Sequence, residues 1–85
     1  MFTGEMVKQA EKLKSAVDKK IKNWNERSQF TIKGVKNLSK SDLETIDLYA
    51  TTYITSGSFK GLMTLRGSIE KVFKAYGIED QYRYL

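Results

Sequence analysis

The sequence contains no cysteine, no histidine and no proline among its 85 residues. Without cysteine and histidine, the chain cannot form a zinc finger, a thiolate cluster, a disulfide framework or a Ser-His-Asp triad. The side chain that most often acts as a general base near neutral pH is also missing. The carboxylates of Asp42, Glu44 and Asp47 stand where a helix is expected to begin, and there they complement the helix dipole. We therefore expect no enzyme, no metal site and no other cofactor.

Long apolar runs are missing as well. The longest is Leu48-Tyr49-Ala50, far short of the roughly 20 residues that a membrane-spanning helix needs. The first residues have neither the positive charge nor the apolar stretch of a signal peptide. Apolar residues make up 40% and charged residues 29% of the chain, proportions typical of a folded globular protein. The sequence predicts one cytoplasmic domain over residues 1–85 that does not contact a membrane.

Three segments show the periodicity of amphipathic helices, so the predicted fold is a mainly all-α, three-helix domain. The first helix is expected at about 3–26, because apolar residues recur there at steps of three and four. They are Met6, Ala10, Leu13, Val17, Ile21 and Trp24.

The second helix is expected at about 39–54. Ser39 is suited to cap it, and Leu38 and Leu43 to form a hydrophobic staple across the cap. Its inner face is predicted to hold Leu43, Ile46, Tyr49, Ala50 and Tyr53.

The third helix is expected at about 58–76, with Gly77 as a left-handed stop. Leu62, Leu65, Ile69, Val72, Phe73 and Tyr76 form its predicted apolar face, followed by a tail at 78–85.

One short segment breaks the helical period. Residues 29–33 read QFTIK, which alternates polar and apolar side chains and is rich in β-formers, and Gly34 follows. A strand this short cannot stand alone. Two interpretations remain open: an extended connector that buries Phe30 and Ile32, or a strand that pairs with its own copy across a homodimer.

Charge is unevenly distributed along the chain, which has a net charge of +5. Residues 1–40 carry ten basic and four acidic side chains, whereas residues 41–85 carry five basic and six acidic ones. This asymmetry predicts a basic surface on one part of the molecule, suited to a polyanion.

Two rows of basic and small residues carry the predicted interface. On the first helix, a spacing of four, three, four and three places one row opposite the apolar stripe. The third helix repeats this spacing with Lys60, Thr64, Gly67, Lys71 and Lys74. A row of ammonium groups on a rigid helix matches a nucleic-acid backbone, although the same row is also typical of an ordinary solvated helix face. The residues of the first row are Lys8, Lys12, Ser15, Lys19 and Lys22.

Two functional hypotheses follow from these features. The first is a small basic regulatory protein that binds nucleic acid, DNA rather than RNA. The order strand-helix-helix is similar to that of ribbon-helix-helix dimers, whereas a helix-turn-helix arrangement would place 58–76 in the major groove. The second is a small helical modulator or inhibitor of a larger protein, of the kind that phages and plasmids encode. Its expected contacts are Gly67 on the third helix and Tyr82, Arg83 and Tyr84 in the tail, because tyrosine and arginine are frequent at interface hot spots.

Overall fold

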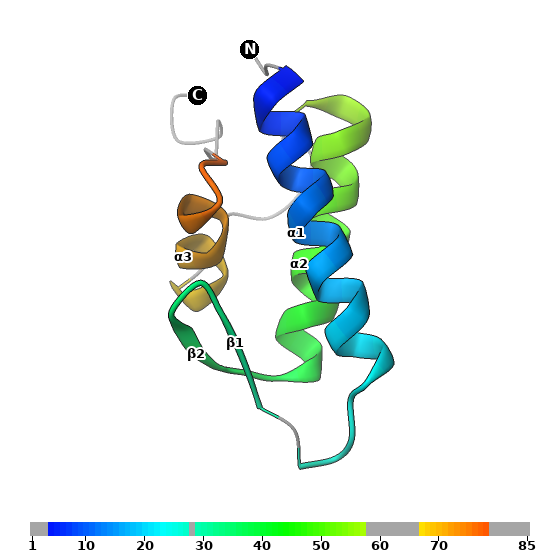
Figure 1. The fold of residues 1–85 in the computed structure, drawn as a ribbon, viewed down its shortest axis with the longest axis vertical. Coiled ribbons are helices and arrows are strands. Elements are labelled where there is room, and N and C mark those ends of the chain that lie inside the picture. Colours follow the sequence, from blue (N-terminus) through cyan, green and yellow to red (C-terminus); the bar gives the residue numbers. More distant parts are fainter. Residues whose placement is uncertain (1–3, 28, 58–66, 79–85) are drawn as a thin grey trace.

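A computed structural model describes residues 4–27, 29–57 and 67–78 of the chain. The elements follow one another as α1 (Gly4–Lys22), β1 (Phe30–Ile32), β2 (Val35–Leu38), α2 (Lys40–Ser56) and α3 (Gly67–Ala75). Helices α1 and α2 lie side by side along the long axis, and the two strands form a hairpin beside them, near α3 (Figure 1). The prediction of a mainly helical fold with three helices is confirmed, whereas the single short extended segment that was predicted is one strand of a two-stranded antiparallel sheet.

Helix α1 buries the predicted stripe but ends earlier than predicted. Ala10, Leu13 and Val17 are fully buried. The helix stops at Lys22 instead of about residue 26. The Lys19 carbonyl accepts both the Asn23 backbone N–H at 3.2 Å and the Asn23 side-chain amide at 3.0 Å. The Trp24 N–H then donates to the Ile21 carbonyl at 3.1 Å, a tighter i→i−3 bond typical of a helix end.

The extended segment at 29–33 is a strand whose partner lies in the same chain. Strand β1 pairs with β2 in antiparallel fashion, with Ile32 opposite Val35. The two residues between them, Lys33 and Gly34, have φ angles of 49° and 83°, which is the type I′ geometry favoured in two-residue hairpins. The prediction included neither β2 nor this turn. Pairing across a dimer stays a prediction.

Helix α2 begins as predicted, with a capping box at Ser39. The Ser39 hydroxyl accepts the Asp42 N–H at 3.2 Å, and the Asp42 carboxylate accepts the Ser39 N–H at 3.0 Å. The helix runs two residues beyond the predicted end and stops at Gly57, whose φ is 75°. All five residues predicted for its inner face are buried.

Helix α3 is described from Gly67 onward. Gly67 has a φ of 43°, a left-handed angle that glycine adopts without steric cost. Residues 58–66, the first part of the helix predicted at about 58–76, lie outside the described residues. The predicted stop is confirmed: Gly77 has a φ of 77°, and the Ile78 N–H donates to the Phe73 carbonyl at 2.9 Å, the bond that defines a Schellman motif.

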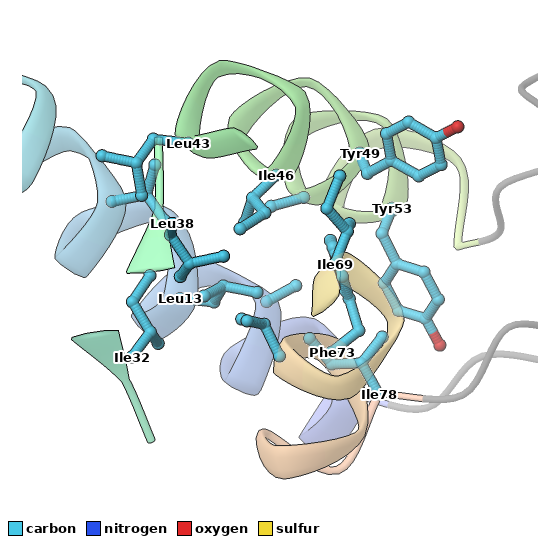
Figure 2. Close-up of a cluster of buried hydrophobic side chains, with 14 residues drawn as sticks. Leu13, Ile32, Leu38, Leu43, Ile46, Tyr49, Tyr53, Ile69, Phe73 and Ile78 are labelled. Atoms are coloured by element: carbon cyan, nitrogen blue, oxygen red, sulfur yellow. The ribbon is translucent and has the colours of Figure 1, made fainter. Parts of the chain in front are cut away.

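One apolar cluster joins these elements (Figure 2). Leu38 from β2 and Leu43 from α2 are both fully buried, which confirms the predicted staple across the Ser39 cap. Of the predicted face of the third helix, Ile69, Val72 and Phe73 are buried and Tyr76 is half-buried. Ile78, the described part of the predicted tail, is only 1% exposed. The cluster holds Ala10, Leu13, Val17, Ile32, Leu38, Leu43, Ile46, Tyr49, Ala50, Tyr53, Ile69, Val72, Phe73 and Ile78.

Candidate nucleic-acid interface

The predicted row on α1 lies on the solvent side of the helix. All five of its residues are exposed, while the opposite side of α1 enters the core. From Lys8 to Lys22 the row is about 21 Å long, at the usual rise of 1.5 Å per residue. None of its four lysines forms an ion pair with any residue that the structure describes. Lys8, Lys12, Lys19 and Lys22 are therefore available to an external anion.

The charge around this row changes along α1. Residues 1–18 carry three lysines and three carboxylates, so this stretch is neutral overall. Glu5 and Glu11 are exposed on the same part of the helix as Lys8 and Lys12. Residues 19–40 carry seven basic side chains against Glu26 alone. The net positive charge of the protein thus comes from this second stretch.

The fold gathers residues 19–40 in one half of the molecule, the lower half in Figure 1, where the β-hairpin reaches up beside α3. This stretch comprises the last turn of α1, the segment leading to β1, the β-hairpin and the start of α2. Asp42 and Glu44 on α2 lie close to it in the chain, and the Asp42 carboxylate is held in the capping box. We call its seven basic residues the basic end: Lys19, Lys20, Lys22, Arg27, Lys33, Lys36 and Lys40.

Three lysines of the basic end lie over aromatic rings. The Lys40 ammonium is 4.5 Å from the centre of the Trp24 ring. Lys33 lies 5.2 Å from the ring centre of Tyr76, and Lys20 lies 5.9 Å from that of Phe30. Each pair links two segments of the chain: α2 to the residue stretch after α1, the turn of the hairpin to the end of α3, and α1 to β1.

Five of the seven basic residues, Lys33 among them, are exposed to solvent. Lys19, Lys22, Arg27, Lys33 and Lys36 are all exposed. The Arg27 N–H donates to the Asn25 side-chain oxygen at 3.0 Å, which shapes the turn after α1 and leaves the guanidinium outside it. The predicted site missed Lys20, Arg27, Lys33, Lys36 and Lys40. The excess of basic residues over 19–40 was the available signal.

The row predicted on the third helix is described only in part, since Lys60 and Thr64 lie outside the described residues. Lys71 and Lys74 are exposed, but the Lys74 ammonium pairs with the Glu70 carboxylate at 3.1 Å. Gly67 is exposed and begins α3. Lys60 and the predicted partner-binding residues Tyr82, Arg83 and Tyr84 lie outside the described residues.

A second polar feature lies between α1 and α2. The Lys14 ammonium contacts the Asp47 carboxylate at 2.8 Å and that of Asp18 at 3.2 Å. Hydrogen bonding to Asp47 raises the pKa of Lys14 above its ordinary value, because the net attraction outweighs the cost of partial burial. Lys14 and Asp18 also line an open groove of about 390 Å³ with Thr51 and Thr55. We assign this trio a structural role, since it ties α1 to α2.

Two further observations limit the chemistry of the described part of the chain. Among residues 4–27, 29–57 and 67–78, no group of three or more carboxylates is placed to hold a metal ion. None of the helices described there has the length and apolar character needed to cross a bilayer. No protein-family model, no curated protein and no solved structure matches the chain.

Proposed function

We propose that the protein is a small regulatory protein that binds nucleic acid, DNA rather than RNA, through contacts between its lysines and the phosphate backbone. The observation that carries the proposal is the segregation of charge. Residues 19–40 hold seven basic side chains against one acidic side chain, and the fold brings them into one half of the molecule. Backbone phosphates are the natural partner of such a surface, since each neutralised phosphate releases condensed counterions.

The lysine row of α1 gives the expected strength of this effect. Four lysine–phosphate contacts predict a slope of about −3.6 for log affinity against log salt concentration. Raising salt from about 50 to 200 mM then weakens binding about 150-fold. Binding of this kind is nearly independent of base sequence, because phosphate contacts position a protein without reading bases.

The test is fluorescence anisotropy with a labelled DNA duplex of random sequence, titrated at several salt concentrations between these limits. Lys19 and Lys22 belong to both the row and the basic end, and both are exposed. The variant K19Q/K22Q should therefore retain the fold but reduce the slope by about 1.8. The variant L48A, on the exposed side of α2, serves as the control with unchanged charge. Absence of saturable binding at the lower salt concentration would refute the proposal.

The alternative function, a modulator that docks on a larger protein, stays a prediction. Its expected contacts in the tail, Tyr82, Arg83 and Tyr84, lie outside the described residues. This alternative would be favoured if the protein does not bind the duplex at low salt but retains a specific protein in a pull-down. Loss of that capture in the variant Y82A/Y84A would then assign the contact to the tail.

A further inference from the structure

We infer that the nucleic acid is held at the basic end, by the last turn of α1, the segment that follows it and the β-hairpin together, and that this partner is a duplex. The sequence predicted a contact along the whole row from Lys8 to Lys22. This inference rests on the proposed function and locates its site, and it assigns contacts to Arg27, Lys33 and Lys36, which that row does not contain.

The first argument is the balance of charge along α1. Lys8 and Lys12 share their part of the helix with Glu5 and Glu11, and the stretch 1–18 is neutral. A polyanion placed there gains the attraction of two lysines but is repelled by the carboxylates. At the other end of α1, the two row lysines add to the excess charge of the hairpin and the preceding segment. The Lys20 ammonium on α1 lies 5.9 Å from the centre of the Phe30 ring on β1, so these two elements approach each other within a Debye length, about 10 Å at 0.1 M salt.

The second argument is the shape of the hairpin. Ile32 and Leu38 point into the core, whereas Thr31, Lys36 and Asn37 are exposed. The two strands therefore form a ribbon with one buried face and one polar face that carries a lysine. A two-stranded ribbon fits the major groove of B-DNA, so the polar face has a form suited to a duplex.

The third argument concerns the aromatic residues of this end. Single-strand binders stack bases on exposed aromatic side chains. Here Trp24, Phe30 and Tyr76 are each half-buried, and a lysine lies over each ring. The rings therefore position ammonium groups and do not offer an open stacking surface.

The same surface is poorly suited to an anionic membrane. Proteins that lie on a bilayer combine basic residues with large apolar side chains that enter the acyl region. Among the described residues, the one large apolar side chain that is exposed is Leu48, in the middle of α2. The basic end therefore offers charge without an apolar anchor.

Two double variants of equal charge change test the location. R27Q/K36Q removes two basic groups from the basic end, and K8Q/K12Q removes two from the neutral part of α1. All four side chains are exposed, and circular dichroism checks that each variant keeps its helical content. The probe is a labelled random DNA duplex, and the measured quantity is the slope of log affinity against log salt concentration. An unlabelled single strand of the same length is the competitor, and vesicles containing phosphatidylserine are a separate probe.

The inference makes distinct predictions for the two variants. Five exposed basic residues in contact with phosphates predict a slope of about −4.5 for the wild type and about −2.7 for R27Q/K36Q. K8Q/K12Q should change the slope by less than about 0.5, whereas a contact along the whole row of α1 predicts a change of about 1.8. The single strand should compete less well than the unlabelled duplex, because its charge density is lower.

Other outcomes would overturn the inference in different ways. A large effect of K8Q/K12Q with none of R27Q/K36Q would move the contact back to α1 and leave the proposed function intact. Tighter binding to the single strand would refute the duplex as partner. Binding to the vesicles but not to the duplex, or no salt-dependent binding to either, would refute both the inference and the proposed function.

Discussion

Two leucines on α2 allow a direct test of how this small protein is stabilised. Leu43 and Leu48 lie on the same helix, but Leu43 is fully buried and Leu48 is 54% exposed. Truncation of a buried leucine to alanine costs about 2–5 kcal/mol, because apolar burial is lost and a cavity is left. Truncation of a leucine on a helix surface usually changes the free energy of unfolding by less than about 0.5 kcal/mol.

The size of the protein makes the expected contrast large. A single core in a chain of this length rarely supplies more than about 3–5 kcal/mol. Leu43→Ala should therefore consume most of the free energy of unfolding, and the variant should be largely unfolded or melt far below the wild type. Leu48→Ala should melt within a few degrees of the wild type.

The measurement is urea-induced unfolding followed by circular dichroism, with linear extrapolation to water. A loss below about 1 kcal/mol for Leu43→Ala would contradict the packing described around the start of α2, since it falls below the range for a buried leucine. An equal loss for Leu48→Ala would show that its side chain is covered in solution. A midpoint that rises with protein concentration would then identify a second copy as the cover.

Two further predictions concern contacts of single side chains. Ser39→Ala removes the acceptor of the Asp42 N–H. It should lower the free energy of unfolding by about 1 kcal/mol, the usual cost of a lost N-cap. If urea unfolding shows a cost near zero, the capping box does not persist in solution. Lys14→Gln should cost at most about 1 kcal/mol, because the Lys14–Asp47 pair is partly exposed. Folding raises the pKa of Lys14, so its contribution should persist up to the ordinary lysine pKa of about 10.4 and disappear as pH rises through the folded value. Wild type and Lys14→Gln should therefore converge in urea midpoint on the alkaline side, and a difference that grows there would contradict this assignment.

Helix α2 shows what the sequence alone can predict. Its cap, its staple and all five residues of its inner face follow from local patterns, because capping and helical periodicity are set by residues within a few positions of one another. The C-terminal end of α1 was harder to predict from the sequence. Trp24 continues the apolar stripe, so periodicity extends the helix, but the backbone N–H of Trp24 already bonds to the Ile21 carbonyl in the tighter i→i−3 pattern of a helix end.

The hairpin was missed because its turn has an unusual first residue. Type I′ turns favour asparagine, aspartate or glycine at positive φ, and here Lys33 takes that position. The Lys33 ammonium lies over the Tyr76 ring. This contact joins residues far apart in the chain, and it occurs at the residue whose backbone φ is strained. Asn37 also has a positive φ, of 63°, at the irregularity in the strand pairing. Such angles depend on tertiary context, which local propensity does not contain.

The candidate interface was predicted in part for a similar reason. The exposure of the α1 lysines follows from helical periodicity and is confirmed. Their electrostatic surroundings depend on which segments meet in space. A charge count over residues 1–40 as a whole does not reveal that the first 18 residues are neutral. Only the fold brings the hairpin into the same half of the molecule as the last turn of α1 (Figure 1).

The position of Trp24 gives the protein a built-in optical probe. It is the single tryptophan of the sequence, it lies at the basic end, and its ring is covered by the Lys40 ammonium at 4.5 Å. An anion that draws this ammonium away changes the electric field at the indole, and with it the intensity and wavelength of the emission. Ligand titrations therefore need no attached dye, and quenching by iodide against caesium would report the sign of the local potential in the free and bound protein.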